Sequence, residues 1–359
     1  MTPAPRAMDD TLQGWAQTLR RCAETRAPLS IRGGGTKAFF GRPVSGEVLA
    51  TGAYRGLVDY EPSELVVTAR AGTPLAELEA GLAERGQRLP FEPPHFGAGA
   101  TLGGCVAAGL SGPRRPYAGA ARDFVLGARI LDGRGQDLAF GGRVMKNVAG
   151  YDVSRLLAGS LGTLGLITEV SLKVLPIPPA EVTLRLELAE AQSIETMNRW
   201  AGQPLPVTAT CWADGELTVR LSGSESGVRA ARGRIGGEEV AGGAAFWGGV
   251  REQTHPFFAG TKVLWRLSVK STAASVALPG RQLIEWGGAL RWWVTDAPEH
   301  EVRGAAMRAG GHATLFRGAR PGQPVFAPLP APLARIHQRL KQAFDPAGIL
   351  NPGRMYPEL

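Results

Sequence analysis

Apolar positions spaced three to four residues apart predict where this chain forms helices. In residues 9–25, four apolar residues from Leu12 to Leu19 would share one helical face, behind polar residues that can cap the helix. Near residue 75 a second helix is predicted, with Thr73 as its cap and Pro74 at its first position. All the predicted helices are residues 9–25, 75–85, 153–157, 193–201, 225–233 and 333–344.

Short apolar and β-branched runs between Gly, Pro and Asp residues predict strands. They fall at residues 28–32, 46–50, 56–60, 64–70, 125–132, 136–140, 166–174, 182–188, 207–212, 216–221, 263–269, 283–286 and 289–294. In the first 90 residues, strands and helices mix in a small α+β unit. After residue 180, the order strand, helix and hairpin predicts an antiparallel sheet backed by helices. We therefore expect an α+β fold.

Length and proline content predict two domains. A chain of 359 residues exceeds the usual limit for one core. Three prolines within residues 176–179 indicate an extended exit, which places a boundary near residue 178. The expected parts are 1–178, divided into subdomains of about 1–92 and 93–178, then 179–330 and 331–359.

Three Gly-rich segments interrupt this pattern, at residues 32–37, 97–123 and 159–168. The first, RGGGTK, follows a predicted strand and carries a cation at each end. Glycine lets a loop turn its amides toward a flat or anionic ligand, so these segments predict a cradle for a pyrophosphate. For residues 97–123, a set of tight turns is the alternative.

Charge and composition narrow the function further. The net charge of +8 comes mostly from scattered Arg, because the chain has only six Lys. It has no basic run with interleaved aromatic residues, which argues against nucleic-acid binding and favours docking to an acidic partner or an anionic lipid surface.

Several common sites are excluded by their missing motifs. No Gly-Lys dipeptide, GxSxG or HExxH occurs, and Leu102 replaces the third Gly of a Rossmann fingerprint. The five His are dispersed and the three Cys form no CxxC, so we expect no metal site and place any iron–sulfur centre on another chain. The first residues lack the apolar core of a signal peptide and no apolar stretch approaches 18 residues, so a cytoplasmic protein is expected, with membrane association only through partners.

The Gly-rich segments together resemble a known family. RGGGT at 32–36, ATLGG at 100–104, Arg122-Asp123, residues 159–176 and PAGILNPGR at 346–354 are similar to the FAD-binding domain of the vanillyl-alcohol oxidase/PCMH-type flavoproteins. The resemblance covers residues 1–178 and the last twenty, which implies that the C-terminal segment returns to the FAD domain, with a smaller antiparallel-sheet cap between. PRRP at 113–116 and residues 145–156 narrow it to flavin subunits of bacterial glycolate-oxidising complexes.

The resemblance implies a set of FAD contacts. Amides of residues 33–36 would hold the pyrophosphate, residues 101–104 would form the opposite wall, and residues 146–152 would contact the flavin edge unless they are a solvated loop. The implied cofactor residues are Arg32, Gly33, Gly34, Gly35, Thr36, Lys37, Ala100, Thr101, Leu102, Gly103, Gly104, Gly109, Gly112, Arg122, Asp123, Lys146, Asn147, Tyr151, Asp152, Gly162, Thr163, Gly165, Ile167 and Thr168.

Departures from the family affect the chemistry. Many relatives carry a His after the Gly triplet for a covalent flavin bond, but Thr36 and Lys37 follow here, so noncovalent FAD is expected. Cys105 could attach to flavin, although a structural thiol is the simpler interpretation. The cap offers His312 as a candidate base and Arg291 as a candidate carboxylate clamp, with a structural role as the alternative for both.

The resemblance also implies partners. It predicts a complex with a larger catalytic flavin subunit and an iron–sulfur subunit, in which a small 2-hydroxy acid is oxidised to a 2-oxo acid. A stand-alone flavin oxidase of alcohols or sugars is a second hypothesis. A structural adapter with an empty or inert flavin site is a third.

Overall fold

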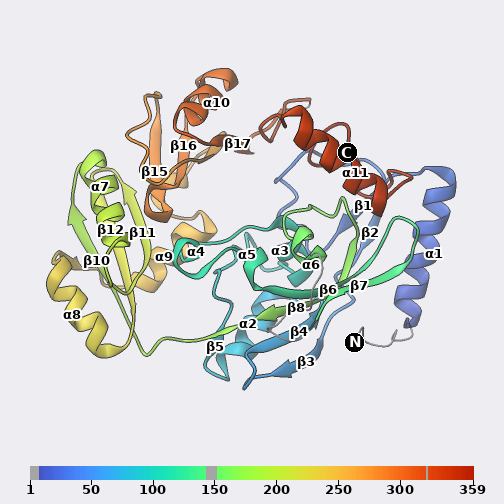
Figure 1. Ribbon diagram of the computed structural model, residues 1–359, viewed down its shortest axis with the longest axis horizontal. Coiled ribbons are helices and arrows are strands. Elements are labelled where there is room, and N and C mark those ends of the chain that lie inside the picture. Colours follow the sequence, from blue (N-terminus) through green and yellow to red (C-terminus); the bar gives the residue numbers. More distant parts are fainter. Residues whose placement is uncertain (1–7, 143–151, 321) are drawn as a thin grey trace.

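The computed structural model describes residues 8–142, 152–320 and 322–359, and two antiparallel sheets organise it (Figure 1). We call residues 8–176 with 331–359 the first unit and residues 180–320 the second unit. The mixture of helices with antiparallel sheets confirms the predicted α+β fold class.

A five-stranded sheet forms the centre of the first unit. Its order is β3 (Leu57–Glu61), β4 (Val66–Arg70), β8 (Leu166–Lys173), β6 (Val125–Leu131) and β7 (Asp137–Gly141). Strand β8 is buried along nearly its whole length, because it lies in the middle of the sheet between β4 and β6. Helices α2 (Leu75–Ala83) and α3 (Leu102–Ala108) pack on the sheet in one hydrophobic cluster, and β5 (Gln87–Arg88) pairs with β9 (Leu175–Pro176) beside it.

The N-terminal elements form a second layer. Helix α1 (Asp10–Thr25) packs against β1 (Leu29–Arg32) and β2 (Glu47–Ala50), which pair in parallel. The side chain of Asp9 accepts the amide of Leu12, so the predicted cap is confirmed.

The helix start at residue 75 differs from the prediction. Pro74 is the residue before the helix, and Thr73 does not cap it. The Thr73 hydroxyl accepts the amide of Gly56 and donates to the carbonyl of Arg70 instead. Thr73 therefore connects the end of β4 to the residue that precedes β3.

The second unit is built on an eight-stranded antiparallel sheet, as predicted. Its order is β13 (Glu238–Glu239), β10 (Ala180–Glu187), β12 (Glu216–Gly223), β11 (Val207–Ala213), β15 (Arg281–Glu285), β16 (Leu290–Val294), β14 (Leu264–Ser268) and β17 (His312–Arg317). Helices α7 (Glu190–Ala201), α8 (Glu225–Ile235) and α10 (Glu299–Arg308) cover its outer face (Figure 1).

The inner face of this sheet packs on the first unit. Phe40, Leu110 and Leu161 of the first unit share a hydrophobic cluster with Trp292 and Phe316 of the second. Helix α9 (Gly243–Glu252) joins this cluster through Trp247 and Val250. The sequence analysis did not predict α9, because its three glycines lower helix propensity while tertiary packing stabilises it.

An ion-pair network also joins the two units. Glu92 of the first unit accepts the Nε of its neighbour Arg114 at 3.1 Å and Nη2 of Arg220 on β12 at 2.9 Å. Arg114 also donates to Glu181 on β10 at 3.1 Å. Since Arg114 and Arg220 are buried, this network fixes the second unit on the first.

The remaining elements surround the Gly-rich segments. The predicted loop at 97–123 contains α3, capped by Thr101, and the single turns α4 (Arg115–Ala118) and α5 (Ala121–Phe124). Another turn, α6 (Val153–Leu156), and the 3₁₀ turns Pro256–Phe258 and Trp286–Gly288 are equally short. Helix α11 (Ala331–Phe344) crosses back to the first unit, where Leu350 pairs with Leu29.

Candidate cofactor site

A cavity of about 260 Å³ lies where β1 ends, beside the start of α3. Its walls come from four distant parts of the sequence: residues 30–44, residues 101–108, Leu161 and residues 351–354. The lining residues are Ser30, Ile31, Arg32, Gly33, Gly34, Gly35, Thr36, Lys37, Ala38, Pro43, Val44, Thr101, Gly104, Ala107, Ala108, Leu161, Asn351 and Arg354. The predicted cradle RGGGTK is therefore one whole wall of this cavity.

The backbone of that wall presents free donors. Among the described residues, no acceptor receives a hydrogen bond from the five consecutive amides of residues 33–37. Gly35 has a φ of +72°, a left-handed conformation that glycine adopts without strain. Successive unpaired amides in such a turn form a nest for anions, so this backbone fits a pyrophosphate.

Two glycines are required by close packing rather than by φ. A Cβ on Gly34 would lie 1.4 Å from the carbonyl oxygen of Gly99, and one on Gly33 would lie 2.5 Å from Oγ1 of Thr101. The first and second Gly-rich segments therefore touch through their backbones. Larger residues would separate the two walls.

Three cations supplement the amides. Arg32 is exposed at the rim, while Lys37 and Arg354 are largely buried. Burial lowers the pKa of Lys37, whose Nζ donates to the carbonyl of His95 at 3.2 Å. Burial, and then the nearby Arg32, lowers the pKa of Arg354. This positive field suits a ligand with two phosphate charges.

The C-terminal segment closes the cavity. The Asn351 side chain accepts the amide of Ile31 at 2.8 Å and donates to the carbonyl of Leu161 at 2.7 Å. Arg354 donates to the carbonyls of Arg42 and Ala38, at 2.8 and 3.1 Å. The tail thus holds the first Gly-rich segment, at residues 32–37, and the third, at residues 159–168, in place.

Several residues that the resemblance implies for FAD do not line this cavity. Ala100, Leu102 and Gly103 lie behind the cavity in the core of the first unit, and Gly109 packs on Gly159. Gly112 lines a different cavity. Of the implied residues that the structure describes, those at the cavity wall are Arg32, Gly33, Gly34, Gly35, Thr36, Lys37, Thr101 and Gly104.

The third Gly-rich segment supports the wall through its backbone. Gly162, at a φ of +73°, abuts Asn351, and the carbonyl of Thr163 accepts Nζ of Lys341. Gly165 packs on Ile130, Ile167 is buried, and the Thr168 hydroxyl donates to Arg129. None of these five residues lines the cavity, and their place at the cofactor stays a prediction.

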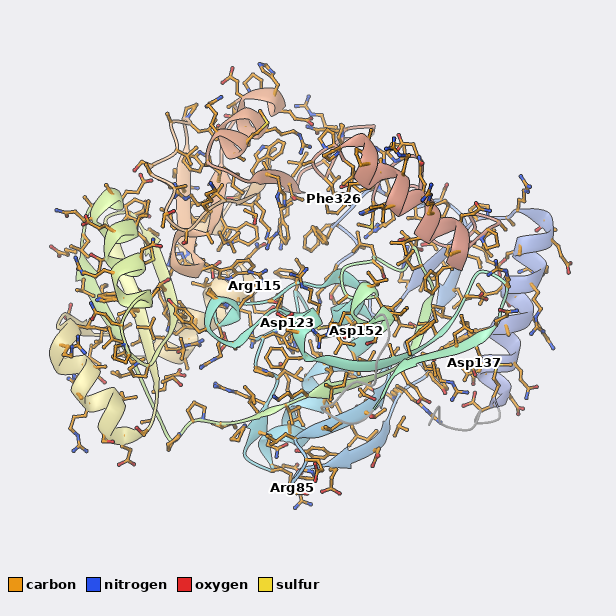
Figure 2. The ribbon with its side chains drawn as sticks, in the orientation of Figure 1. Arg85, Arg115, Asp123, Asp137, Asp152 and Phe326 are labelled. Atoms are coloured by element: carbon orange, nitrogen blue, oxygen red, sulfur yellow. The ribbon has the colours of Figure 1, made fainter. Side chains whose placement is uncertain are left out.

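Of the remaining implied residues, Arg122, Asp123 and Asp152 are described by the structure and do not line the cavity. The exposed side chain of Arg122 lies 3.8 Å from Asp123, which caps α5 by accepting the amide of Ala120. Asp152 caps α6 (Figure 2 labels Asp123 and Asp152). Lys146, Asn147 and Tyr151 lie outside the described residues.

Sequence reasoning missed several lining residues. Pro43, Val44, Asn351 and Arg354 line the cavity but were not predicted there. The tail motif at 346–354 was the available signal for Asn351 and Arg354. Pro43 and Val44 follow no motif, because only the tertiary fold places their loop beside residues 32–37.

The strand register corrects one catalytic candidate. Arg291 on β16 pairs with Leu267 and Ile284, which face away from the first unit. Its side chain is fully buried and donates to the carbonyls of Gly288, Ala273 and Ala274. Arg291 therefore braces the loop at 273–274, and the predicted carboxylate clamp is wrong.

The second catalytic candidate lies on the other face. His312 begins β17 opposite Ser268, on the side of the sheet that faces the first unit. Burial, and then Arg266, lowers the pKa of His312. The residue itself is exposed at the start of the strand and does not line the cavity.

Cys105 is a buried thiol inside α3. Burial raises the pKa of Cys105 to about 12, although Lys37 opposes the shift. Its side chain packs in the core and does not line the cavity. Within residues 8–142, 152–320 and 322–359, no three His, Cys, Asp or Glu gather as a metal site, and no helix is long and apolar enough to cross a membrane.

Comparison with known proteins agrees with this site. Residues 10–141 match the FAD binding domain family. Among solved structures, p-cresol methylhydroxylase with substrate bound aligns over 96% of this chain and 87% of its own, with a TM-score of 0.68 and 13% identity. Alkyldihydroxyacetonephosphate synthase aligns over 94% of this chain and 74% of its own, with a TM-score of 0.65 and 15% identity. Fold and site together define an FAD-dependent oxidoreductase with a PCMH-type FAD-binding domain.

A full-length relative narrows the class. Glycolate oxidase subunit GlcE of Escherichia coli (strain K12) is 52% identical over 350 residues, which cover 98% of this chain and 99% of the relative. This chain belongs to the GlcE family. Glycolate oxidase subunit GlcD of Bacillus subtilis (strain 168) is 32% identical over 50% of this chain and 38% of its own length.

Proposed function

We propose that this chain is the FAD-carrying subunit of a complex that oxidises glycolate, a 2-hydroxy acid, to glyoxylate. The single observation that carries the cofactor role is the row of five amides at residues 33–37, which have no partner in the part of the chain that the structure describes and lie beside Lys37 and Arg354. The name of the full-length relative supports glycolate as the substrate.

The FAD is proposed to be held noncovalently. Thr36 and Lys37 follow the Gly triplet, and neither is the His that forms the flavin bond in many relatives. Cys105 is buried with a raised pKa, so the reactive thiolate form is disfavoured. The amides and cations would then retain the cofactor through its pyrophosphate alone.

Oxidation of a 2-hydroxy acid removes a hydride from carbon and a proton from the hydroxyl. Bound FAD supplies the two-electron acceptor. The imidazole of His312 is our candidate to accept the proton, because its lowered pKa favours the unprotonated form that can do so. The aromatic cluster around Phe40, Trp292 and Phe316 would exclude water between the units.

The partners are part of the same proposal. Electrons would leave through an iron–sulfur subunit, and a larger flavin subunit would share the oxidation. The net charge of +8 suits docking to acidic partner surfaces. We place the complex in the cytoplasm, with membrane contact only through the partners.

A visible absorption spectrum of the purified chain, before and after acid precipitation, tests the proposal. Flavin bands that move to the supernatant are expected. Anaerobic reduction by glycolate should then be faster with the partner subunits than without them. A colourless chain that takes up no added FAD would instead indicate a structural adapter, and full glycolate oxidation by the lone chain would indicate a stand-alone oxidase.

A further inference from the structure

A second, narrow cavity lies between the two units. Residues 94–113 of the first unit form one wall, and side chains of α9, β14, β15 and β16 form the other. Ala108 lines the cofactor cavity and Leu110, two residues later, lines this one. The two cavities are therefore neighbours along one segment of the chain.

Arg266 faces this cavity from β14. It pairs with Trp292 and Thr314, so it lies on the sheet face that meets the first unit, opposite to Arg291. Among the described residues, its guanidinium makes no hydrogen bond or ion pair and lies only over the ring of Trp286, at 5.1 Å. Burial, and then Arg115, lowers the pKa of Arg266 to about 10, which still leaves it cationic near neutral pH.

Gln253 offers a second free donor to the same cavity. Its side-chain oxygen accepts Nε of Arg317 at 3.0 Å, so the orientation of the amide is fixed. Its Nε2 is buried and has no partner among the described residues. An unpaired buried donor is costly, and Nε2 of Gln253 is one. Together with the half-buried guanidinium of Arg266, which also has no hydrogen-bond partner among the described residues, it indicates a site for an acceptor with at least two oxygens.

Glu285 is the charged neighbour that could compete with a ligand. Its Oε2 accepts Nε1 of Trp292 at 2.7 Å. Burial raises the pKa of Glu285 to about 7, although Trp292 and Arg266 oppose the shift. Below that pH the carboxyl is neutral and does not offset the charge of Arg266.

We propose that Arg266 and Gln253 bind the carboxylate of a small hydroxy acid in this cavity. The proposal rests on the function proposed above, and it assigns to Arg266 the clamp that the sequence placed at Arg291. A planar guanidinium with a fixed amide beside it matches the two oxygens of a carboxylate.

The size of the cavity restricts the ligand. Its free space is about 20 Å³, the room of about one water molecule. Even a two-carbon acid therefore needs the rim side chain of Arg251, or the second unit as a whole, to shift on binding. This selects small acids over long ones.

Calorimetric titration of the full-length chain with oxalate tests the site, with FAD content recorded on each sample. Oxalate has a carboxylate but no oxidisable C–H bond, so binding is measured without turnover. We expect R266Q to weaken oxalate binding about tenfold or more, and Q253A to weaken it less. R229Q, which removes an equal charge from the exposed face of α8, should bind oxalate as the unchanged chain does. Glutarate should bind more weakly than oxalate.

Each outcome bears on one proposal. Oxalate binding that R266Q leaves unchanged, in protein with normal FAD content, overturns this inference alone. Chain without flavin that binds oxalate through Arg266 supports the inference and contradicts the proposed cofactor role. If R266Q does not fold, R266K is the second variant, because Lys keeps the positive charge but lacks the paired N–H donors of the guanidinium. R266K should still bind oxalate more weakly, and unchanged affinity would then overturn the inference.

Discussion

The buried carboxyl of Glu285 makes the stability of this chain depend on pH. Glu285 sits on the inner face of the second sheet, with Arg266, Glu92 and, on the cavity wall, Arg251 as the charged groups around it. Its burial raises its pKa from 4.5 to about 7. The folded chain therefore binds more protons than the unfolded chain between those values, and stability falls as pH rises through them.

The substitution E285Q should remove this penalty. Gln can still accept Nε1 of Trp292 but cannot ionise. We expect the free energy of unfolding of E285Q to exceed that of the unchanged chain by up to about 3 kcal/mol above pH 7, and to match it more closely near pH 5. Urea denaturation at pH 5 and pH 8 measures this difference. The exposed E195Q on α7 is the control, and a pH-independent difference for E285Q would contradict the expectation.

Pairs of loops, rather than single loops, make the cofactor cavity. Gly34 and Gly99 come from different Gly-rich segments and touch through their backbones. G34A should force these segments apart, because its Cβ would overlap the Gly99 carbonyl. FAD affinity is expected to fall at least about tenfold. Fluorescence titration with FAD measures it, and G52A, whose Cβ would meet no atom within 4 Å, is the control. Equal affinity in G34A and G52A would refute the role of this contact.

Local pattern predicted most elements of this chain but only part of its site. The apolar and polar residues that alternate along β10 to β12, and the apolar residues three to four positions apart in α1, are local patterns, so the sequence alone predicted these elements. The RGGGTK wall was visible for the same reason. Arg291 and Arg266 both lie on predicted strands, yet which of them faces the first unit depends on strand register, and that is a tertiary property. Gly-rich α9 was missed because packing, not propensity, stabilises it.

At the scale of the whole molecule, Glu92 connects the two units. Burial alone would raise the pKa of Glu92, but Arg220 and Arg114 outweigh it and lower the pKa. The stabilisation is therefore present above the ordinary pKa of Glu and is lost as pH falls through the lowered value. Acid should release the second unit from the first before it unfolds either sheet.

The substitution E92Q should imitate acid at neutral pH. It leaves two buried guanidinium groups without their shared carboxylate, which costs about 3–5 kcal/mol. Limited proteolysis near residues 176–179 at pH 7 is expected to be faster in E92Q than in E195Q. The two variants should converge at acid pH, below the lowered pKa of Glu92, where the unchanged chain also loses this charge. Equal cleavage rates at pH 7 would show that the hydrophobic cluster alone holds the units together.

The tail contacts of Asn351 and Arg354 also set an order of events during protein synthesis. Residues 31–42 emerge from the ribosome early, but the side chains that hold them in shape come more than 300 residues later. The amide nest can form only in a nascent chain translated past Arg354, even though domains generally fold in order from the N-terminus. FAD would therefore be loaded only after residue 354 has been synthesised, and premature termination upstream of residue 351 would yield a chain with both sheets but no place for its cofactor.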